Sequence, residues 1–182
     1  MKYFFKNIAI NFFAITIVLT SSTLFATTLK VGMQAPNFKL QATTGDYYQL
    51  SDYQGKQAVV IAWYPMANTR GCTIECKSLT EQRHLIRAFD VSYFMISVDS
   101  LDDNRDFAKK TGADFPMLSD PSKATAKAYD VLNLFRVASR VTFYISKEGK
   151  ILNIDEEVTP KTAAEDIAKQ LEILAIKKVR KK

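Results

Sequence analysis

The sequence contains few of the side chains that build disulfide frameworks and metal centres. Its 182 residues include two cysteines, Cys72 and Cys76, and a single histidine, His84. A disulfide between cysteines four positions apart closes a short loop and restrains the unfolded chain little, so the pair is a poor structural staple. Two thiols this close are better explained as a redox couple.

Internal repeats and a basic face are also missing. The net charge is +6, but Lys2, Lys6 and five basic residues in the tail at 177–182 carry seven positive charges. The net charge of the rest of the chain is therefore close to −1. Because the positive charge sits at the two ends, the sequence argues against a surface for nucleic acid.

Residues 1–26 have the layout of a secretory signal peptide. Two lysines precede an apolar stretch at 8–19, and Leu24-Phe25-Ala26 offers a small residue for cleavage. This predicts an exported protein, periplasmic in a bacterium. The alternative is an uncleaved anchor, because residues 8–26 nearly reach the roughly 20 residues of a spanning helix. Contact with a membrane is expected only through this segment.

Residues 27–176 predict one α/β domain. Apolar runs at 58–64 and 91–98 lack alternation, which is typical of strands covered on both faces. A helix expected at 72–89 joins them, so the two strands should be parallel with a right-handed crossover. The other expected elements are a hairpin at 38–50, helices at 102–112, 120–129 and 159–174, and a hairpin made by 141–146 and 151–154. Asp102 is expected to cap the first of these helices, and Pro121 to be the first helical residue of the second.

This order of elements satisfies a thioredoxin-like fold, with a central mixed sheet flanked by helices and an N-terminal hairpin extension. Cys72 then follows the carboxyl end of a central strand, where open α/β sheets place their sites. It also lies at a helix N-terminus, whose amide dipoles favour negative charge. We therefore expect its thiol to ionise more readily than a free cysteine, whose pKa is about 8.5.

The residues just before Cys72 suit a small polar ligand. Pro65 ends the strand and can form a dry wall over the sulfur. Thr69 can cap the helix and present its hydroxyl to the ligand. Gly71 lets a ligand approach the backbone closely.

A thiolate that attacks a peroxide also needs a positive group, because negative charge builds on the leaving oxygen. Arginine is the natural source, since it stays protonated and donates from a planar fork. Arg140 is the candidate, because its strand is expected beside the central one. Arg70 and Arg136 are rivals that the sequence leaves open.

The segment around Cys72 resembles the peroxiredoxin active-site pattern P-x-x-x-T-x-x-C, and most closely that of the peroxiredoxin Q (bacterioferritin comigratory protein) branch. The matching positions are Tyr64-Pro65, Thr69, Gly71-Cys72-Thr73, Glu75, 115–121, 126–129 and 140–150. The resemblance implies a thioredoxin-like fold, a peroxidatic Cys72 and a peroxide-binding quartet completed by Pro65, Thr69 and Arg140.

The sequence departs from that branch in two places. Asn68 and Arg70 stand where the branch often has Asp and Pro. The resolving cysteine of the branch lies five residues after the first, where this chain has Lys77, and Cys76 comes one residue earlier. Cys76 is our candidate resolving thiol, which requires the first turn of the helix to unwind. The alternative makes Cys76 a small buried hydrophobe of a one-cysteine enzyme.

Two other functions remain open from the sequence. Sco-type copper chaperones also have Cys-x-x-x-Cys, and thiolates suit Cu(I). However, His84 lies inside the expected helix and Arg140 occupies the region where a ligand would be wanted. A thiol–disulfide oxidoreductase would normally carry Cys-x-x-Cys, which is one residue shorter.

The best-supported hypothesis is a thiol peroxidase of antioxidant defence that reduces hydrogen peroxide and organic hydroperoxides. Cys72 becomes a sulfenic acid, and a Cys72–Cys76 disulfide recycles it. An external dithiol protein of the thioredoxin type is the expected reductant. No metal or other cofactor is expected, and the resemblance implies a monomer.

Overall fold

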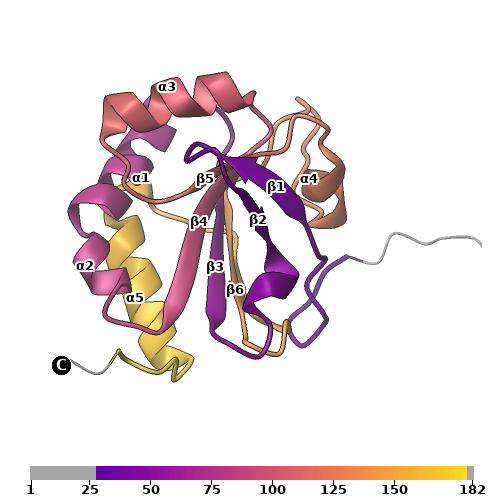
Figure 1. The fold of residues 1–182 in the computed structure, drawn as a ribbon, viewed down its shortest axis with the longest axis vertical. Coiled ribbons are helices and arrows are strands. Elements are labelled where there is room, and N and C mark those ends of the chain that lie inside the picture. The colour runs from indigo at the N-terminus through magenta and orange to yellow at the C-terminus, as the bar shows by residue number, and fades with distance from the viewer. Residues whose placement is uncertain (1–27, 180–182) are drawn as a thin grey trace, which may run out of the picture.

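The computed structural model describes residues 28–179 (Figure 1). The predicted signal peptide at 1–26 and the last three residues of the basic tail lie outside the described residues. The described part forms a seven-stranded mixed sheet in the order β2-β1-β5-β4-β3-β6-β7, with helices on both faces. Within residues 28–179, no helix is long and apolar enough to cross a membrane.

The strands are β1 (Lys39–Ala42), β2 (Tyr47–Gln49), β3 (Ala58–Trp63), β4 (Val91–Ser97), β5 (Met117–Ser119), β6 (Val141–Ile145) and β7 (Ile151–Asp155). The α-helices are α1 (Arg70–Glu81), α2 (Arg83–Ile86), α3 (Leu101–Thr111), α4 (Ala124–Ala128) and α5 (Ala163–Ile173). Two short 3-10 helices are η1 (Leu50–Tyr53) and η2 (Pro160–Thr162).

The centre of the sheet has the predicted arrangement. β3 and β4 are parallel, with Ala58 opposite Val91 and Trp63 opposite Ile96. β6 runs antiparallel on the other side of β3, and β1 and β2 form the N-terminal hairpin. The predicted thioredoxin-like fold, with its mixed sheet and hairpin extension, is confirmed.

The strand β5 was not predicted from the sequence. It is three residues long, pairs in parallel with β4 and runs antiparallel to β1. It therefore joins the N-terminal hairpin to the rest of the sheet. A strand this short has no periodic pattern of its own, so its pairing depends on neighbours distant in sequence.

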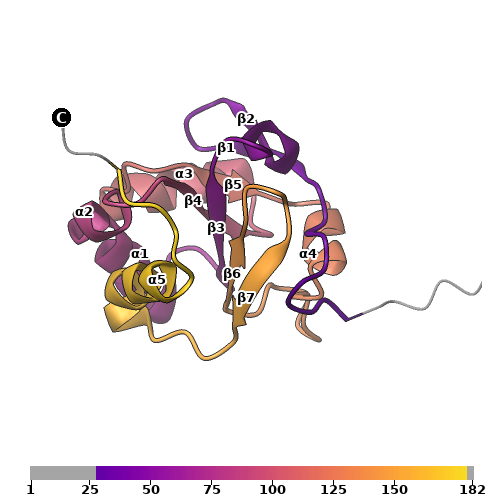
Figure 2. The same ribbon diagram turned by 90° about the horizontal axis from the view of Figure 1, so that it is seen from below.

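The continuous apolar run of β3 is explained by the two layers around it. Val59, Ile61 and Trp63 belong to the apolar cluster on the α4 side, whereas Val60 and Ala62 belong to the cluster under α1, α3 and α5. Figure 2 shows α4 on one side of the sheet and α1, α2 and α5 on the other. Because both faces of the strand are buried, alternation with polar residues is absent.

The predicted helix at 72–89 is wrong in its extent. α1 begins two residues earlier, and the helix is interrupted at Gln82, whose φ of −105° and ψ of 18° are not helical. The docking of α5 accounts for this bend. The Ser78 hydroxyl accepts a hydrogen bond from the Ala164 backbone amide at 3.2 Å, and the Gln82 side-chain Nε2 donates to the Glu165 carboxylate at 2.8 Å. Contacts with α5 thus interrupt the helix at Gln82, although the sequence pattern continues to residue 89.

Two predicted helix starts also need correction. Ser100, not Asp102, caps α3, because its hydroxyl accepts a hydrogen bond from the Asp103 amide at 3.1 Å. α4 begins at Ala124, so Pro121 precedes the helix rather than opening it. The reason is the buried Asp120 carboxylate, which accepts from the Ala126 amide at 2.8 Å and holds the intervening residues in a turn.

Candidate active site

The loop between β3 and α1 is held at both sides by hydrogen bonds. The Tyr64 amide donates to the Ile96 carbonyl at 3.0 Å and prolongs the strand pairing by one residue. Pro65 has no amide hydrogen to continue the ladder, so the strand ends there. The Ala67 amide donates to the Asp99 carboxylate at 2.8 Å and fastens the loop to the residues after β4.

The same loop requires an unusual backbone conformation at Asn68. Its φ is 61°, in the left-handed region that asparagine tolerates better than most residues. Its side-chain amide donates to the Asp106 carboxylate of α3 at 3.3 Å. The loop is therefore tied to α3 just before α1 begins.

Thr69 occupies the N-cap position of α1, as predicted, but its hydroxyl does not cap the helix. The hydroxyl donates to the Met66 carbonyl at 2.9 Å, and the first helical hydrogen bond runs from the Thr73 amide to the Thr69 carbonyl at 2.9 Å. The amides of Arg70, Gly71 and Cys72 precede that bond and contribute the positive end of the helix.

Arg140 is the arginine that the fold brings to Cys72. It lies directly before β6, and its Nη2 donates to Cys72 Sγ at 3.3 Å although 68 positions separate the two residues. Cys72 is only 1% exposed. The rival candidates Arg70 and Arg136 have exposed side chains. The pairing of β6 with β3 therefore decides among the three.

Glu75 is a site residue whose role the sequence did not reveal. Its carboxylate is 1% exposed and forms an ion pair with Arg140 Nη1, while Nη2 faces the sulfur. A buried charge of this kind is stable only when it is paired. The sequence signal that could have indicated its burial is its helical spacing from its neighbours. The buried face of α1 carries Cys72, Glu75, Cys76 and Leu79.

Gly71 makes room for the arginine. A Cβ atom built at this position would lie 3.2 Å from Arg140 Nη2. The guanidinium therefore approaches the backbone closely at Gly71, whereas the close approach of a ligand stays a prediction. A side chain here would compete with the position that Arg140 takes beside Cys72.

Cys76 lies one helical turn after Cys72 on the same inner face of α1. It is fully buried, and its Sγ lies 3.2 Å from Thr111 Oγ1 at the end of α3. Burial raises the pKa of its thiol. Both cysteines of the described chain are free thiols.

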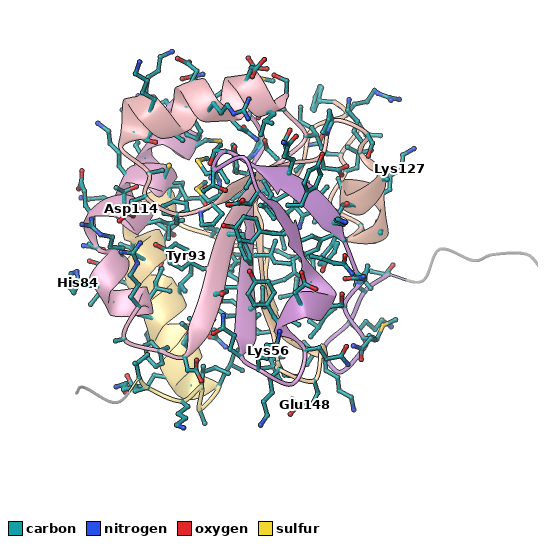
Figure 3. All side chains as sticks on the ribbon, in the orientation of Figure 1. Lys56, His84, Tyr93, Asp114, Lys127 and Glu148 are labelled. Atoms are coloured by element: carbon teal, nitrogen blue, oxygen red, sulfur yellow. The ribbon has the colours of Figure 1, made fainter. Side chains whose placement is uncertain are left out.

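His84 lies on α2 and its side chain is exposed on the outer side of that helix (Figure 3). The described residues therefore bring no histidine to the two cysteines. They also contain no group of three or more His, Cys, Asp or Glu side chains arranged to hold a metal ion.

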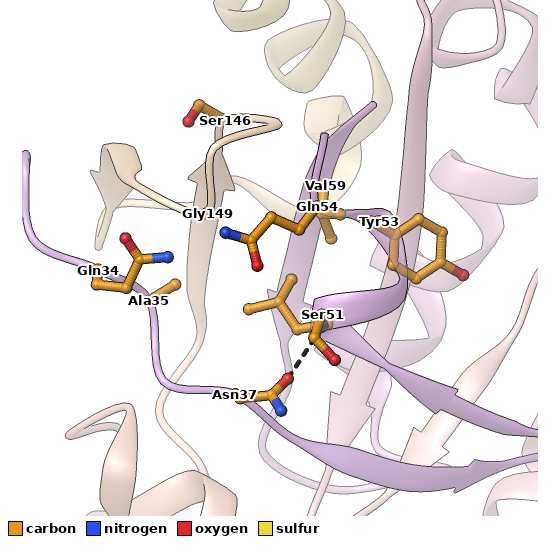
Figure 4. Close-up of a pocket in the computed structure, with 10 residues that line it drawn as sticks. Gln34, Ala35, Asn37, Ser51, Tyr53, Gln54, Val59, Ser146 and Gly149 are labelled. Atoms are coloured by element: carbon orange, nitrogen blue, oxygen red, sulfur yellow. Dashed lines mark hydrogen bonds between the residues drawn. The ribbon is translucent and has the colours of Figure 1, made fainter. Parts of the chain in front are cut away.

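A separate pocket lies at the other end of the sheet, between the start of β3 and the β6–β7 turn (Figure 4). Gln34, Asn37, Tyr53 and Ser146 are among its lining residues. None of the described residues that line it is a charged side chain or a cysteine. It therefore takes no part in the chemistry of Cys72, which follows the opposite end of β3.

Comparisons with known proteins match this arrangement. The AhpC/TSA family model matches residues 31–154. The chain is 31% identical over 132 residues to peroxiredoxin Bcp of Bacillus subtilis, covering 69% of this chain and 83% of that protein. It is 29% identical over 136 residues to peroxiredoxin Bcp of Escherichia coli K12, covering 71% and 86%. The crystal structure of peroxidoxin BcpB from Mycobacterium tuberculosis is similar with a TM-score of 0.72 at 27% identity, covering 80% and 97%.

Proposed function

The chain belongs to the AhpC/TSA family and is a peroxiredoxin, an enzyme that reduces peroxides, and we propose that Cys72 is the thiol that attacks the substrate. The observation that carries this proposal is the 3.3 Å contact between Arg140 Nη2 and Cys72 Sγ. A guanidinium at hydrogen-bond distance stabilises a thiolate over a neutral thiol. It also stays charged throughout the reaction.

In the proposed first step, the Cys72 thiolate attacks one oxygen of the peroxide. An S–O bond forms, the O–O bond breaks, and the leaving hydroxide or alkoxide takes a proton to become water or an alcohol. Arg140 and the first amides of α1 stabilise the negative charge that moves from sulfur to the leaving oxygen. Cys72 is left as a sulfenic acid.

Thr69 and Pro65 have supporting roles in this step. The Thr69 hydroxyl donates its hydrogen bond to the Met66 carbonyl. Its oxygen can therefore accept a hydrogen bond from the O–H of a hydroperoxide. Pro65 is half-buried and has no amide hydrogen to donate, and in this proposal it forms an apolar wall beside the sulfur.

In the proposed second step, the Cys76 thiol condenses with the Cys72 sulfenic acid. The S–S bond forms as the S–O bond breaks, and water leaves with the thiol proton. An external dithiol protein then reduces the disulfide by thiol–disulfide exchange. The short spacing of the two cysteines on α1 supports this proposal, provided that the helix unwinds locally.

Stopped-flow reduction of hydrogen peroxide tests the first step. Cys72→Ser should abolish peroxide consumption beyond the uncatalysed rate, whereas Cys76→Ser should retain the first turnover. A Cys72→Ser enzyme that keeps the wild-type rate would rule out this mechanism.

Intact mass after one equivalent of peroxide tests the second step. A protein that forms the disulfide loses two hydrogens, whereas a persisting sulfenic acid adds one oxygen. The oxygen adduct in the wild type would assign the chain to the one-cysteine type.

Residues 1–26 support a further proposal about location, namely that the enzyme is exported and acts in the periplasm of a bacterium. Their basic start, apolar stretch and small residue at Ala26 are typical of a cleaved signal peptide. Expression of the full chain followed by fractionation and N-terminal mass analysis tests it. Recovery of uncleaved protein in the cytoplasmic fraction would overturn it.

A further inference from the structure

The hydrogen bonds around Thr111 determine how Cys76 is held. The Thr111 hydroxyl lies 2.7 Å from the Phe107 carbonyl and 3.3 Å from the Ala108 carbonyl, both of which can only accept. A hydroxyl has one proton to donate, so that proton goes to α3's own backbone. Toward Cys76, at 3.2 Å, the Thr111 oxygen is therefore the acceptor and the thiol is the donor.

We propose that Thr111 is a positioning residue that holds Cys76 as a buried, protonated thiol until Cys72 has been oxidised. This inference rests on the proposed role of Cys76 as the resolving thiol. Thr111 lies on α3, so the hydrogen bond joins the part of α1 that must unwind to a neighbouring helix. Breaking that bond is part of the barrier to disulfide formation.

The sequence neighbour of Cys76 explains why early release would be harmful. Glu75 pairs with Arg140, which in turn contacts Cys72. Unwinding α1 far enough to move Cys76 toward Cys72 also withdraws Glu75 from the arginine. A held Cys76 therefore keeps the peroxide pocket assembled during the first step.

The delay has a chemical cost. The longer Cys76 stays on Thr111, the longer the Cys72 sulfenic acid is exposed to a second peroxide, which oxidises it to the sulfinic acid and leaves as water or alcohol. Thr111 thus sets the balance between productive disulfide formation and irreversible oxidation.

Thr111→Val tests the inference, because it removes the acceptor while preserving shape. The rate of disulfide formation, followed by acid quench and intact mass, should rise by up to about fivefold relative to the rate of sulfenic acid formation. Fivefold corresponds to roughly 1 kcal/mol, the net value of a typical hydrogen bond, and a thiol is a weaker donor than an N–H or O–H group. The sulfinic fraction at high peroxide should fall. Thr111→Ser retains the hydroxyl and should behave like the wild type.

Thr125→Val is the matched control, because Thr125 is a helical threonine of similar burial on the opposite face of the sheet. It should leave both rates unchanged. A Thr111→Val enzyme with wild-type or slower disulfide formation would overturn the inference. A wild-type enzyme that forms no disulfide at all would instead show that the proposed role of Cys76 is wrong, and the inference would fall with it.

A second measurement covers the case in which Thr111→Val folds poorly. In a Cys72→Ser background, alkylation of Cys76 in the folded protein should be faster in Thr111→Ala, which lacks the acceptor, than in Thr111→Ser, which keeps it. Equal rates would show that Thr111 does not hold the thiol.

Discussion

Arg140 interacts with two different partners through its two terminal nitrogens. Nη1 pairs with the buried Glu75 carboxylate and Nη2 donates to Cys72 Sγ. The planar guanidinium can satisfy both at once, which the single ammonium of a lysine could not do with the same geometry. Glu75 thus orients the arginine, and its own burial is tolerable because it is paired.

Glu75→Gln should lower kcat/KM for hydrogen peroxide by about 10- to 100-fold, the scale on which a small misplacement of a catalytic group acts. The residual charge of Arg140 remains, but the side chain loses the anchor that aims it. Stopped-flow kinetics measure the effect. Glu172→Gln, which breaks the exposed pair between Glu172 and Lys178, is the control and should leave kcat/KM unchanged. Wild-type activity in Glu75→Gln would show that Arg140 needs no such anchor.

The pKa of Cys76 gives a prediction about pH and stability. Burial raises the pKa of this thiol in the folded protein above its ordinary value. The unfolded chain therefore loses the proton first as pH rises. In a Cys72→Ser background, the stability linked to Cys76 is fully present below about pH 8.5 and is lost as pH rises through the folded pKa.

Urea unfolding between pH 7 and 10 checks this by comparing Cys72→Ser with Cys72→Ser/Cys76→Ser. The free energy of unfolding should fall more steeply with pH when Cys76 is present. Parallel curves for the two proteins would contradict the raised pKa.

At the scale of elements, α3 connects the two halves of the proposed site. Its Asn104 accepts a hydrogen bond from the Tyr64 hydroxyl at 2.6 Å, just before Pro65, and its Asp106 accepts from Asn68. At the other end of the helix, Thr111 accepts from Cys76. The helix therefore supports the loop that precedes Cys72 and also holds the second thiol.

Two substitutions at the start of α3 test whether Ser100, as in the structure, or Asp102, as predicted from the sequence, caps the helix. Ser100→Ala should reduce the free energy of unfolding by about 1 kcal/mol, because the Asp103 amide loses its acceptor. Asp102→Ala should change it by less than about 0.5 kcal/mol, since the Asp102 side chain is 91% exposed and its pair with Arg105 is a surface one. Thermal and urea unfolding measure both, and the reverse order of effects would favour Asp102 as the cap.

At the scale of the whole molecule, the mixed sheet assembles the site. The parallel pairing of β3 and β4 sets Cys72 beyond the carboxyl end of the central strand. The antiparallel pairing of β6 with β3 delivers Arg140 to the same end from the opposite chain direction. Apolar clusters on both faces make this sheet a rigid support, whereas the chemistry proposed for α1 requires a local change.

Hydrogen exchange in the oxidised enzyme should show a local change in α1 and an unchanged sheet. Backbone amides at 73–77 should exchange at least tenfold faster in the disulfide form than in the reduced form, because the turn that holds them must unwind. Amides of β3 and β4 should keep their protection. Mass spectrometry of the exchanged peptides measures this, with Cys76→Ser treated with one equivalent of peroxide as the control that cannot form the disulfide. Loss of protection throughout the sheet would contradict a local change.

The sequence by itself determined the features that depend on residues close together along the chain. The apolar runs of β3 and β4, the helix that starts just before Cys72 and the glycine that ends α3 all follow from local patterns. The family resemblance also depends on such short motifs. These patterns were sufficient to predict the fold and to place the Cys72 thiol beyond the carboxyl end of the central strand β3.

The family resemblance named Arg140, but only the tertiary structure shows which distant side chains contact the two thiols. Arg140 comes from 68 positions away and Thr111 lies 35 positions from Cys76. The pairing of Glu75 with Arg140, the short strand β5 and the bend at Gln82 likewise depend on packing between separate elements. Periodicity and capping describe one segment at a time, and they carry no information about which segments come into contact.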